Sequence, residues 1–190
     1  MKRKKIEKKL RKELDKERYE HTMGVMYTAA ALAMAHQSDI EQAMYAGLLH
    51  DCAKCVPNND KLRLCEEYQI PIRDSERRCP FLLHAKLGAY FAEYNYKVND
   101  PIILHAIKVH TTGVPDMNTL DKIIYIADYI EPNRKDAPNL SEIRRLAFED
   151  LDKAMLQILT DTLAYLREKG GELDTMTVQT YNYYKEFLSQ

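Results

Sequence analysis

A histidine and an aspartate stand side by side at the end of a stretch of small and apolar residues, since His50 and Asp51 directly follow residues 43–49, AMYAGLL. Ser38 and Glu41 form the pattern of a capping box, which predicts that a helix begins there and ends near Asp51. A carboxylate among buried apolar residues costs several kcal/mol unless it is paired or binds a metal ion. The chain must therefore fold so that other segments bring partners to Asp51.

The remainder of the chain carries helix signals and no convincing alternating strand pattern. Residues 99–101, Asn-Asp-Pro, predict the start of a helix that runs to His110, and Asn118 or Thr119 predicts the cap of a helix over 120–130. Further helices are expected over 139–169, closed by Gly170 and Gly171, and over 175–188. Loops are expected at 56–59, 69–80 and 131–138.

These signals predict one all-α domain, a bundle of about seven or eight helices over residues 1–190. We divide it into a basic N-terminal helix over 1–17, a metal-site core over 18–134 and C-terminal helices over 135–190. Residues 1–12 hold eight basic side chains and one Glu. Ile6, Leu10 and Leu14 recur every four residues, which predicts a solvated helix with one narrow apolar stripe rather than a binding arm.

Composition limits the partners and the location. The chain is 45% hydrophobic and 30% charged, with a formal net charge of −1, so attraction of the whole molecule to nucleic acid is not expected. We expect neither a signal peptide nor a membrane span, and we expect a soluble, cytoplasmic protein without a nucleic-acid or membrane partner. Apolar stripes beyond the core are compatible with a homodimer.

The four cysteines are expected to be reduced thiols. Cys52 and Cys55 have the CxxC spacing of redox and zinc motifs, but no second CxxC and no preceding strand accompany them. We interpret them as bystanders beside the metal site.

Four more potential ligands lie on or beside apolar helical patterns of other segments: His21, His84, His110 and Asp128. Neutral imidazole and carboxylate are ligands that transition metals prefer. Asp128 interrupts an apolar stretch over 123–130, where a salt bridge to a buried arginine is the alternative explanation. His105 lies about 140° around the helix from His110, so both cannot enter one site. We assign His105, and also His36, to structure or surface.

Groups suited to phosphate neighbour these candidates. Arg18 precedes His21 by nearly one helical turn, Lys54 follows Asp51 by three residues, and Arg134 lies just beyond the predicted helix of Asp128. Arginine binds phosphate in a bidentate manner and lysine acts as a point charge. Thr111 and Thr112 can offer hydroxyl groups beside His110.

In chain order, five motifs carry a resemblance to a known family: RYEH (18–21), LLHDCAK (48–54), PFLLHA (80–85), HTTG (110–113) and ADYIEPNR (127–134). Together they resemble the HD-domain metal phosphohydrolases, and most closely the YqeK-type family of bacterial symmetrical bis(5′-nucleosyl)-tetraphosphatases. The match runs from Arg18 to residues 180–182. The sequence departs from the family at Cys52, where an aromatic or aliphatic residue is more usual.

The resemblance implies a cofactor of two iron ions, which Mn, Co or Zn can replace. The implied ligands are His21, His50, Asp51 and Asp128 for one ion, with His84 and His110 holding the second and Asp51 bridging. The implied catalytic residues are Asp51, Lys54 and Arg134. The implied substrate-binding residues are Arg18, His84, His110, Thr111, Arg134, Gly170, Gly171, Glu172 and Leu173.

The implied activity is hydrolysis of diadenosine tetraphosphate and related dinucleotides into two nucleoside diphosphates. Three alternatives stay open from the sequence. The first is another HD-domain enzyme acting on nucleotides or cyclic dinucleotides. The second is a di-iron oxygenase. The third is a nucleotide-binding module without catalytic activity, in which the metal is structural.

Overall fold

The computed structural model describes residues 1–189, and over that range it consists of helices and connecting loops without a β-strand. The expected all-α class is confirmed. Eleven α-helices and one short 3₁₀ helix follow in chain order: α1 (Arg3–Glu13), α2 (Lys16–Ala35), α3 (Ile40–Leu49), α4 (Asn58–Glu67), α5 (Asp74–Arg78), η1 (Pro80–Leu82), α6 (Leu83–Tyr94), α7 (Pro101–Val109), α8 (Thr119–Ile130), α9 (Leu140–Glu149), α10 (Leu151–Glu168) and α11 (Thr175–Phe187).

The helix number within residues 1–189 exceeds the predicted seven or eight: α4 begins inside the loop expected at 56–59, and two further helices begin at capping carboxylates that were not anticipated. Residues 69–80, expected as loop, contain α5, where Glu76 accepts a hydrogen bond from the Arg73 backbone N–H at 2.7 Å. The long helix expected over 139–169 is broken at Asp150, whose extended backbone ends α9. Its side chain then accepts from the N–H groups of Asp152 and Lys153 and begins α10.

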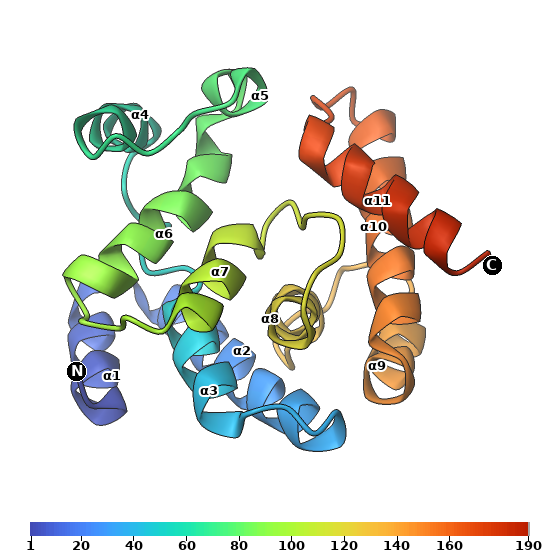
Figure 1. Cartoon of the computed structure of the whole chain (residues 1–190), viewed down its shortest axis with the longest axis horizontal. Helices are drawn as coiled ribbons and strands as arrows, with labels where there is room; N and C mark the ends of the chain where they lie inside the picture. The colour runs from blue at the N-terminus through green and yellow to red at the C-terminus, as the bar shows by residue number, and fades with distance from the viewer. Residues whose placement is uncertain (190) are drawn as a thin grey trace.

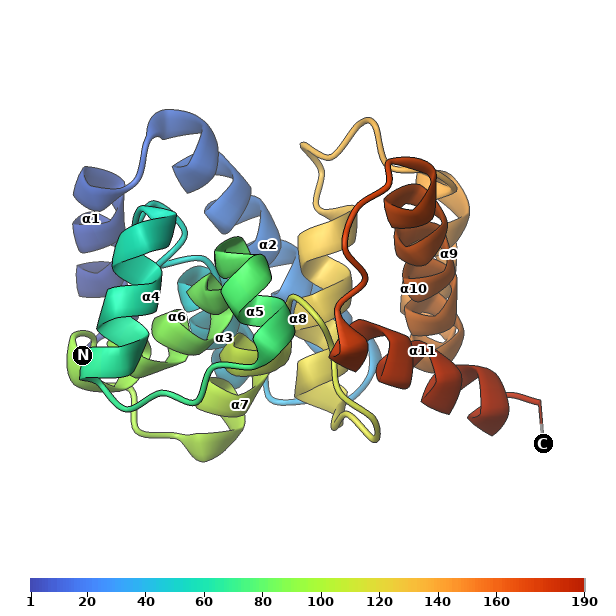
Figure 2. The same ribbon diagram turned by 90° about the horizontal axis from the view of Figure 1, so that it is seen from above.

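Helix α8 lies at the centre of the arrangement. In Figures 1 and 2 it stands between α1–α7 on one side and α9–α11 on the other, and it contacts α2, α3 and α7 as well as α9 and α10. Most of its side chains are buried, with Ile123, Ile124 and Ile126 fully so. Asn118 and Asp121 form a capping box at its start. A helix covered on several sides holds its C-terminal end, which carries Asp128, in a fixed position.

The apolar stripe expected in the basic N-terminal segment lies in α1, which covers less than the predicted span of 1–17. Ile6 and Leu10 of α1 are fully buried, Leu14 nearly so, and the basic side chains stay on the outer faces. Within residues 1–189, no helix is long and apolar enough to cross a membrane.

Helices α2 and α3 pack very closely because small residues line their contact. A Cβ placed on Gly47 of α3 would lie 2.9 Å from the Cα of Met26 on α2, closer than side chains tolerate. Ala43 and Ala46 on the same helix are fully buried. The small-residue stretch before His50 therefore brings the end of α3 against α2, which carries His21.

Gly47→Ala is expected to lower the free energy of unfolding by about 1–3 kcal/mol, because the added methyl group forces α2 and α3 apart. Gly88→Ala in α6 is the matched control, since the atoms nearest to its new Cβ lie at 3.4 Å or more. That control should be neutral or slightly stabilising. Urea unfolding followed by circular dichroism measures both variants, and equal stability of the two would contradict this account of the contact.

Candidate metal centre

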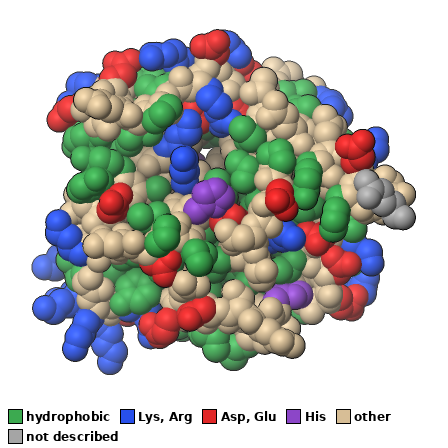
Figure 3. All heavy atoms as spheres, in the orientation of Figure 1, with side chains coloured by type: hydrophobic (Ala, Val, Ile, Leu, Met, Phe, Trp, Pro, Cys, Tyr) green, Lys and Arg blue, Asp and Glu red, His purple; other side chains and the backbone are tan. Residues whose placement is uncertain are grey.

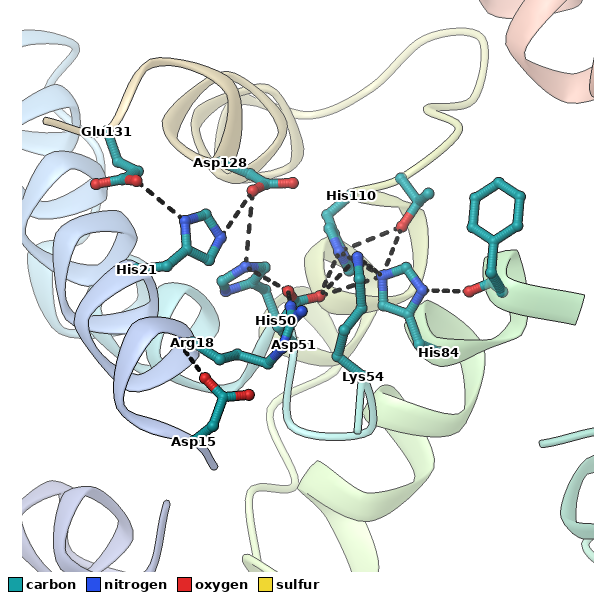
Figure 4. A network of polar contacts seen from close by, with 12 residues as sticks. Asp15, Arg18, His21, His50, Asp51, Lys54, His84, His110, Asp128 and Glu131 are labelled. Atoms are coloured by element: carbon teal, nitrogen blue, oxygen red, sulfur yellow. Dashed lines mark hydrogen bonds and ion pairs between the residues drawn. The ribbon is translucent and has the colours of Figure 1, made fainter. Parts of the chain in front are cut away.

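Asp51 lies at the centre of the site, in the turn that follows α3, and is 2% exposed. Its Oδ1 lies 3.2 Å from Nε2 of His84 and 3.6 Å from Nε2 of His110. Its Oδ2 lies 3.7 Å from Nε2 of His50 and 3.1 Å from Nη1 of Arg18. The two oxygens of one carboxylate thus face different histidines, as Figure 4 shows. This is the arrangement of a carboxylate able to bridge two cations.

Three imidazoles are oriented in the same way. His50, His84 and His110 each hold Nδ1 within hydrogen-bond distance of the backbone carbonyl three residues earlier, at 2.7, 2.5 and 2.7 Å. A carbonyl only accepts, so Nδ1 carries the proton and the Nε2 lone pair is directed at the centre. All three histidines lie at helix ends, which explains their common orientation. His50 and His110 are the C-caps of α3 and α7, and His84 lies near the start of α6.

At the other end of the cluster, His21 of α2 lies between two carboxylates of α8 and its C-cap. Its Nε2 is 3.0 Å from Oδ1 of Asp128, and its Nδ1 is 3.1 Å from Oε1 of Glu131. Glu131 is 1% exposed and was not predicted from the sequence. The available signal was a carboxylate three residues after Asp128, at the end of the same apolar helix. Gly24 makes room for it, because a Cβ there would lie 2.3 Å from Oε2 of Glu131.

The six predicted ligands are thereby brought together, and we call them the His/Asp cluster: His21, His50, Asp51, His84, His110 and Asp128. Their ligand atoms form three overlapping groups, each within 4.8 Å: His21 with His50 and Asp51; His50 with His110 and Asp128; and Asp51 with His84 and His110. Two buried atoms of the cluster, Nε2 of His50 and Oδ1 of Asp51, lack a hydrogen-bond partner. Orphaned buried groups are costly, and a metal cation would satisfy both. The residues therefore fit a metal centre.

The electrostatics of the cluster agree with this fit. Burial lowers the pKa of His50 to about 4 and also lowers the pKa of His84, so both imidazoles are neutral near pH 7, as metal ligands must be. Burial alone would raise the pKa of Asp51, but the neighbouring histidines and Lys54 outweigh it and hold that pKa well below its usual range. Asp128 is held ionised in the same way, mainly by its hydrogen bond to His21.

Three cations border the cluster, and we call them the cationic rim: Arg18, Lys54 and Arg134. Lys54 places Nζ 3.4 Å from Oδ1 of Asp51, and Arg134 places Nη2 2.9 Å from Oδ1 of Asp128. The space-filling view shows Lys and Arg side chains gathered beside a histidine at the hollow in this face (Figure 3).

A large cavity opens at the cluster, and a smaller one lies next to Thr111. The larger, the basic cleft, has a volume of about 720 Å³ and is lined by Asp15, Lys16, Glu17, Arg18, His21, Asp51, Lys54, Glu131, Asn133 and Arg134. The smaller, the side pocket, has a volume of about 200 Å³ and is lined by Ser75, Cys79, Phe81, Leu82, Thr111, Thr162, Leu166, Glu172, Asp174 and Thr177.

Of the other predicted substrate-binding residues, Thr111 and Glu172 line the side pocket. The Thr111 hydroxyl is 3.2 Å from Nε2 of both His84 and His110. Glu172, in the loop between α10 and α11, lines the pocket and forms an ion pair with Arg78. Gly170, Gly171 and Leu173 belong to the same loop but are not among the residues that line the pocket.

Two histidines stay outside the cluster, as predicted. His36 places Nε2 2.7 Å from the carbonyl of Ala147, and His105 pairs with Asp121 at 2.9 Å. The four cysteines are free, and none belongs to a potential metal-binding group within residues 1–189. Burial raises the pKa of Cys52, which keeps its thiol protonated.

The sequence and the structure are both similar to those of known HD-domain proteins. The HD domain family pattern matches residues 18–133. Two relatives are named symmetrical bis(5′-nucleosyl)-tetraphosphatase: that of Bacillus subtilis is 38% identical over 92% of each chain, and that of Staphylococcus aureus is 35% identical over 93% of this chain and 92% of its own. A crystal structure from Clostridium acetobutylicum, described as a predicted HD superfamily hydrolase involved in NAD metabolism, superposes with a TM-score of 0.95 at 40% identity over 98% of each chain.

His50→Ala and Asp128→Ala are each expected to abolish tight metal binding, because each removes a ligand from the group that His50 forms with His110 and Asp128. His36→Ala and His105→Ala are the matched controls and should keep the full metal content of the unaltered protein. Elemental analysis of the purified variants, with circular dichroism to verify folding, gives the readout. A normal metal content in Asp128→Ala would contradict the ligand assignment.

Glu131→Gln is expected to weaken metal affinity by about 10–100-fold, since a carboxylate behind a ligating imidazole fixes its orientation and raises its basicity. The substitution keeps the side-chain volume, so the fold should persist. Competition with a coloured chelator measures the affinity. Unchanged affinity would mean that Glu131 serves only to pack against Gly24.

Proposed function

The chain belongs to the HD domain family, and we propose that it hydrolyses diadenosine tetraphosphate and related dinucleoside tetraphosphates at the central phosphoanhydride bond. The products would be two nucleoside diphosphates. The observation that carries this proposal is the His/Asp cluster, with Asp51 facing histidines on both sides and a rim of cations at its edge. Relatives named for this activity are similar over nearly their whole length.

We propose that the cluster binds two iron ions, which Mn, Co or Zn can replace. His21, His50, Asp51 and Asp128 would hold one ion, and His84 and His110 the other, with Asp51 shared. Such ions neutralise phosphoryl charge and lower the pKa of a coordinated water from 15.7 toward about 7. Support for the bridging role comes from the two Asp51 oxygens, which face different histidines.

The cationic rim would bind the polyphosphate. Lys54 and Arg134 have positions from which they can stabilise negative charge that develops on the phosphoryl oxygens. Arg18 supplies a guanidinium beside Asp51, a geometry suited to bidentate phosphate contacts. Each of these cations is paired with a cluster carboxylate, which a phosphate would replace as its partner. The metal ions would then supply the counter-charge for Asp51 and Asp128.

We assign one nucleoside to the side pocket. Its volume of about 200 Å³ lies below the 300–1,000 Å³ of pockets that enclose whole ligands, so it suits a ring rather than a complete nucleotide. Phe81 and Leu82 supply apolar surface for a base, and Thr111 connects the pocket to His84 and His110. The loop that contains Gly170, Gly171, Glu172 and Leu173 would close the nucleoside side of the site.

Diadenosine tetraphosphate incubated with the metal-loaded protein should give ADP as the sole primary product. Chromatography at an early time point separates ADP from AMP and ATP. In ¹⁸O-labelled water, one label should enter only one of the two ADP molecules per turnover, because water adds to a single phosphorus. Primary formation of AMP and ATP would contradict the symmetrical cut. His50→Ala serves as the inactive control.

A further inference from the structure

The basic cleft extends along the His/Asp cluster from His21 to Asp51 and Lys54, whereas the side pocket lies beyond the His84 end, next to Thr111. The cleft includes Arg18 and His21, whereas the side pocket begins at Thr111, beside His84. Figure 4 shows the cluster as a row with His21 at one end and His84 at the other. A substrate with two arms that crosses the row would therefore place one arm in each cavity.

The two cavities differ in chemistry. Every residue that lines the basic cleft has a charged or polar side chain, and four of them are cations: Lys16, Arg18, Lys54 and Arg134. The Lys16 side chain is 87% exposed, with Nζ 3.8 Å from Oε1 of Glu20. The side pocket instead offers the apolar side chains of Phe81, Leu82 and Leu166.

Protein recognition of a base depends on stacking against a flat side chain and on hydrogen bonds to the base edges. The basic cleft has cations for phosphates and carboxylates for ribose hydroxyls, and its lining contains no aliphatic side chain. Its one ring, that of His21, is held between Asp128 and Glu131, and the guanidinium groups of Arg18 and Arg134 are paired with Asp51 and Asp128, so none of them is free to stack on a base. The cleft is also more than three times larger than the side pocket and imposes no close shape. Its chemistry therefore selects phosphate and ignores the base attached to it.

We propose that the protein reads only one of the two nucleosides and holds the far half of its substrate through phosphates alone. This inference rests on the proposed function and extends its substrate class to nucleoside tetraphosphates that carry no second nucleoside. Adenosine 5′-tetraphosphate would be cut into ADP and pyrophosphate. Water adds to the second phosphorus from adenosine, and the bond from that phosphorus to the oxygen bridging to the third phosphorus breaks. Pyrophosphate leaves with that oxygen, and the water proton passes to solvent.

The test compares kcat/KM of the metal-loaded protein for diadenosine tetraphosphate, adenosine 5′-tetraphosphate and inorganic tetraphosphate. The first two values should agree within about tenfold, a difference of at most about 1.4 kcal/mol. Inorganic tetraphosphate, which has no base for the side pocket, should be at least tenfold poorer. A value for adenosine tetraphosphate more than 100-fold below that for the dinucleotide, or cleavage to ATP and phosphate, would overturn the inference. Failure to cut diadenosine tetraphosphate at all would instead refute the proposed function.

Variants of the two cavities provide a second measurement. Phe81→Ala should lower kcat/KM for both nucleotides by about 5- to 150-fold, the range for loss of a base-stacking side chain, and leave inorganic tetraphosphate unaffected. Lys16→Ala and Glu17→Gln should leave the ratio of the two nucleotide values unchanged, whatever their effect on each value. If either cleft variant impairs the dinucleotide selectively, the cleft contacts the second nucleoside and the inference is wrong.

Discussion

A buried carboxylate organises this molecule. Asp51 is almost inaccessible, and it remains ionised because imidazoles and cations from several helices converge on it. Arg18 comes from α2, His84 from α6 and His110 from the end of α7. Removing water from a charge is tolerated only when such partners are supplied. The relative positions of these helix ends therefore satisfy one electrostatic requirement of the site.

Helix α8 supplies the carboxylates at the other end of the cluster, where Asp128 and Glu131 contact His21. It is covered on several sides, so Asp128 and the adjacent Glu131 have little freedom to move. Glu131 reaches His21 only because α2 has a glycine at position 24. Close helix approach therefore occurs twice along α2, at Gly24 toward α8 and at Met26 toward Gly47 of α3. Both contacts position His21 relative to the rest of the cluster.

The charge distribution follows a simple order from inside to outside. Neutral imidazoles and ionised carboxylates occupy the buried centre, where a metal cation would be compensated. Cations lie at the edge, where a polyphosphate would exchange places with carboxylate partners. Beyond the edge the two sides differ, since one cavity is charged and the other has apolar walls. This asymmetry lets a protein act symmetrically on its substrate while binding its two halves differently.

The helical class, several helix starts and the six residues of the cluster could be read from the sequence alone. These depend on local chemistry: Asn118 caps α8 as predicted, whereas the cap of α3 is Asp39 and not Ser38 of the expected capping box. Separation of His105 from His110 also follows from helix geometry alone. The five motifs together also indicate the family, because their residue types and their order are specific, whereas a single histidine is not.

The contacts between residues distant in the sequence could be seen only in the folded structure. Glu131 behind His21, the break at Asp150 and the helix α5 within an expected loop all depend on contacts or caps that periodicity does not encode. The side pocket joins Phe81 to Glu172, 91 positions away, through the packing of α10 and α11 against the core. The pattern of apolar residues shows which face of a helix is buried, but not how close two helices lie. Here Gly47 sets the distance between α2 and α3, Gly24 makes room for Glu131, and the buried carboxylate of Asp51 requires partners from several helices.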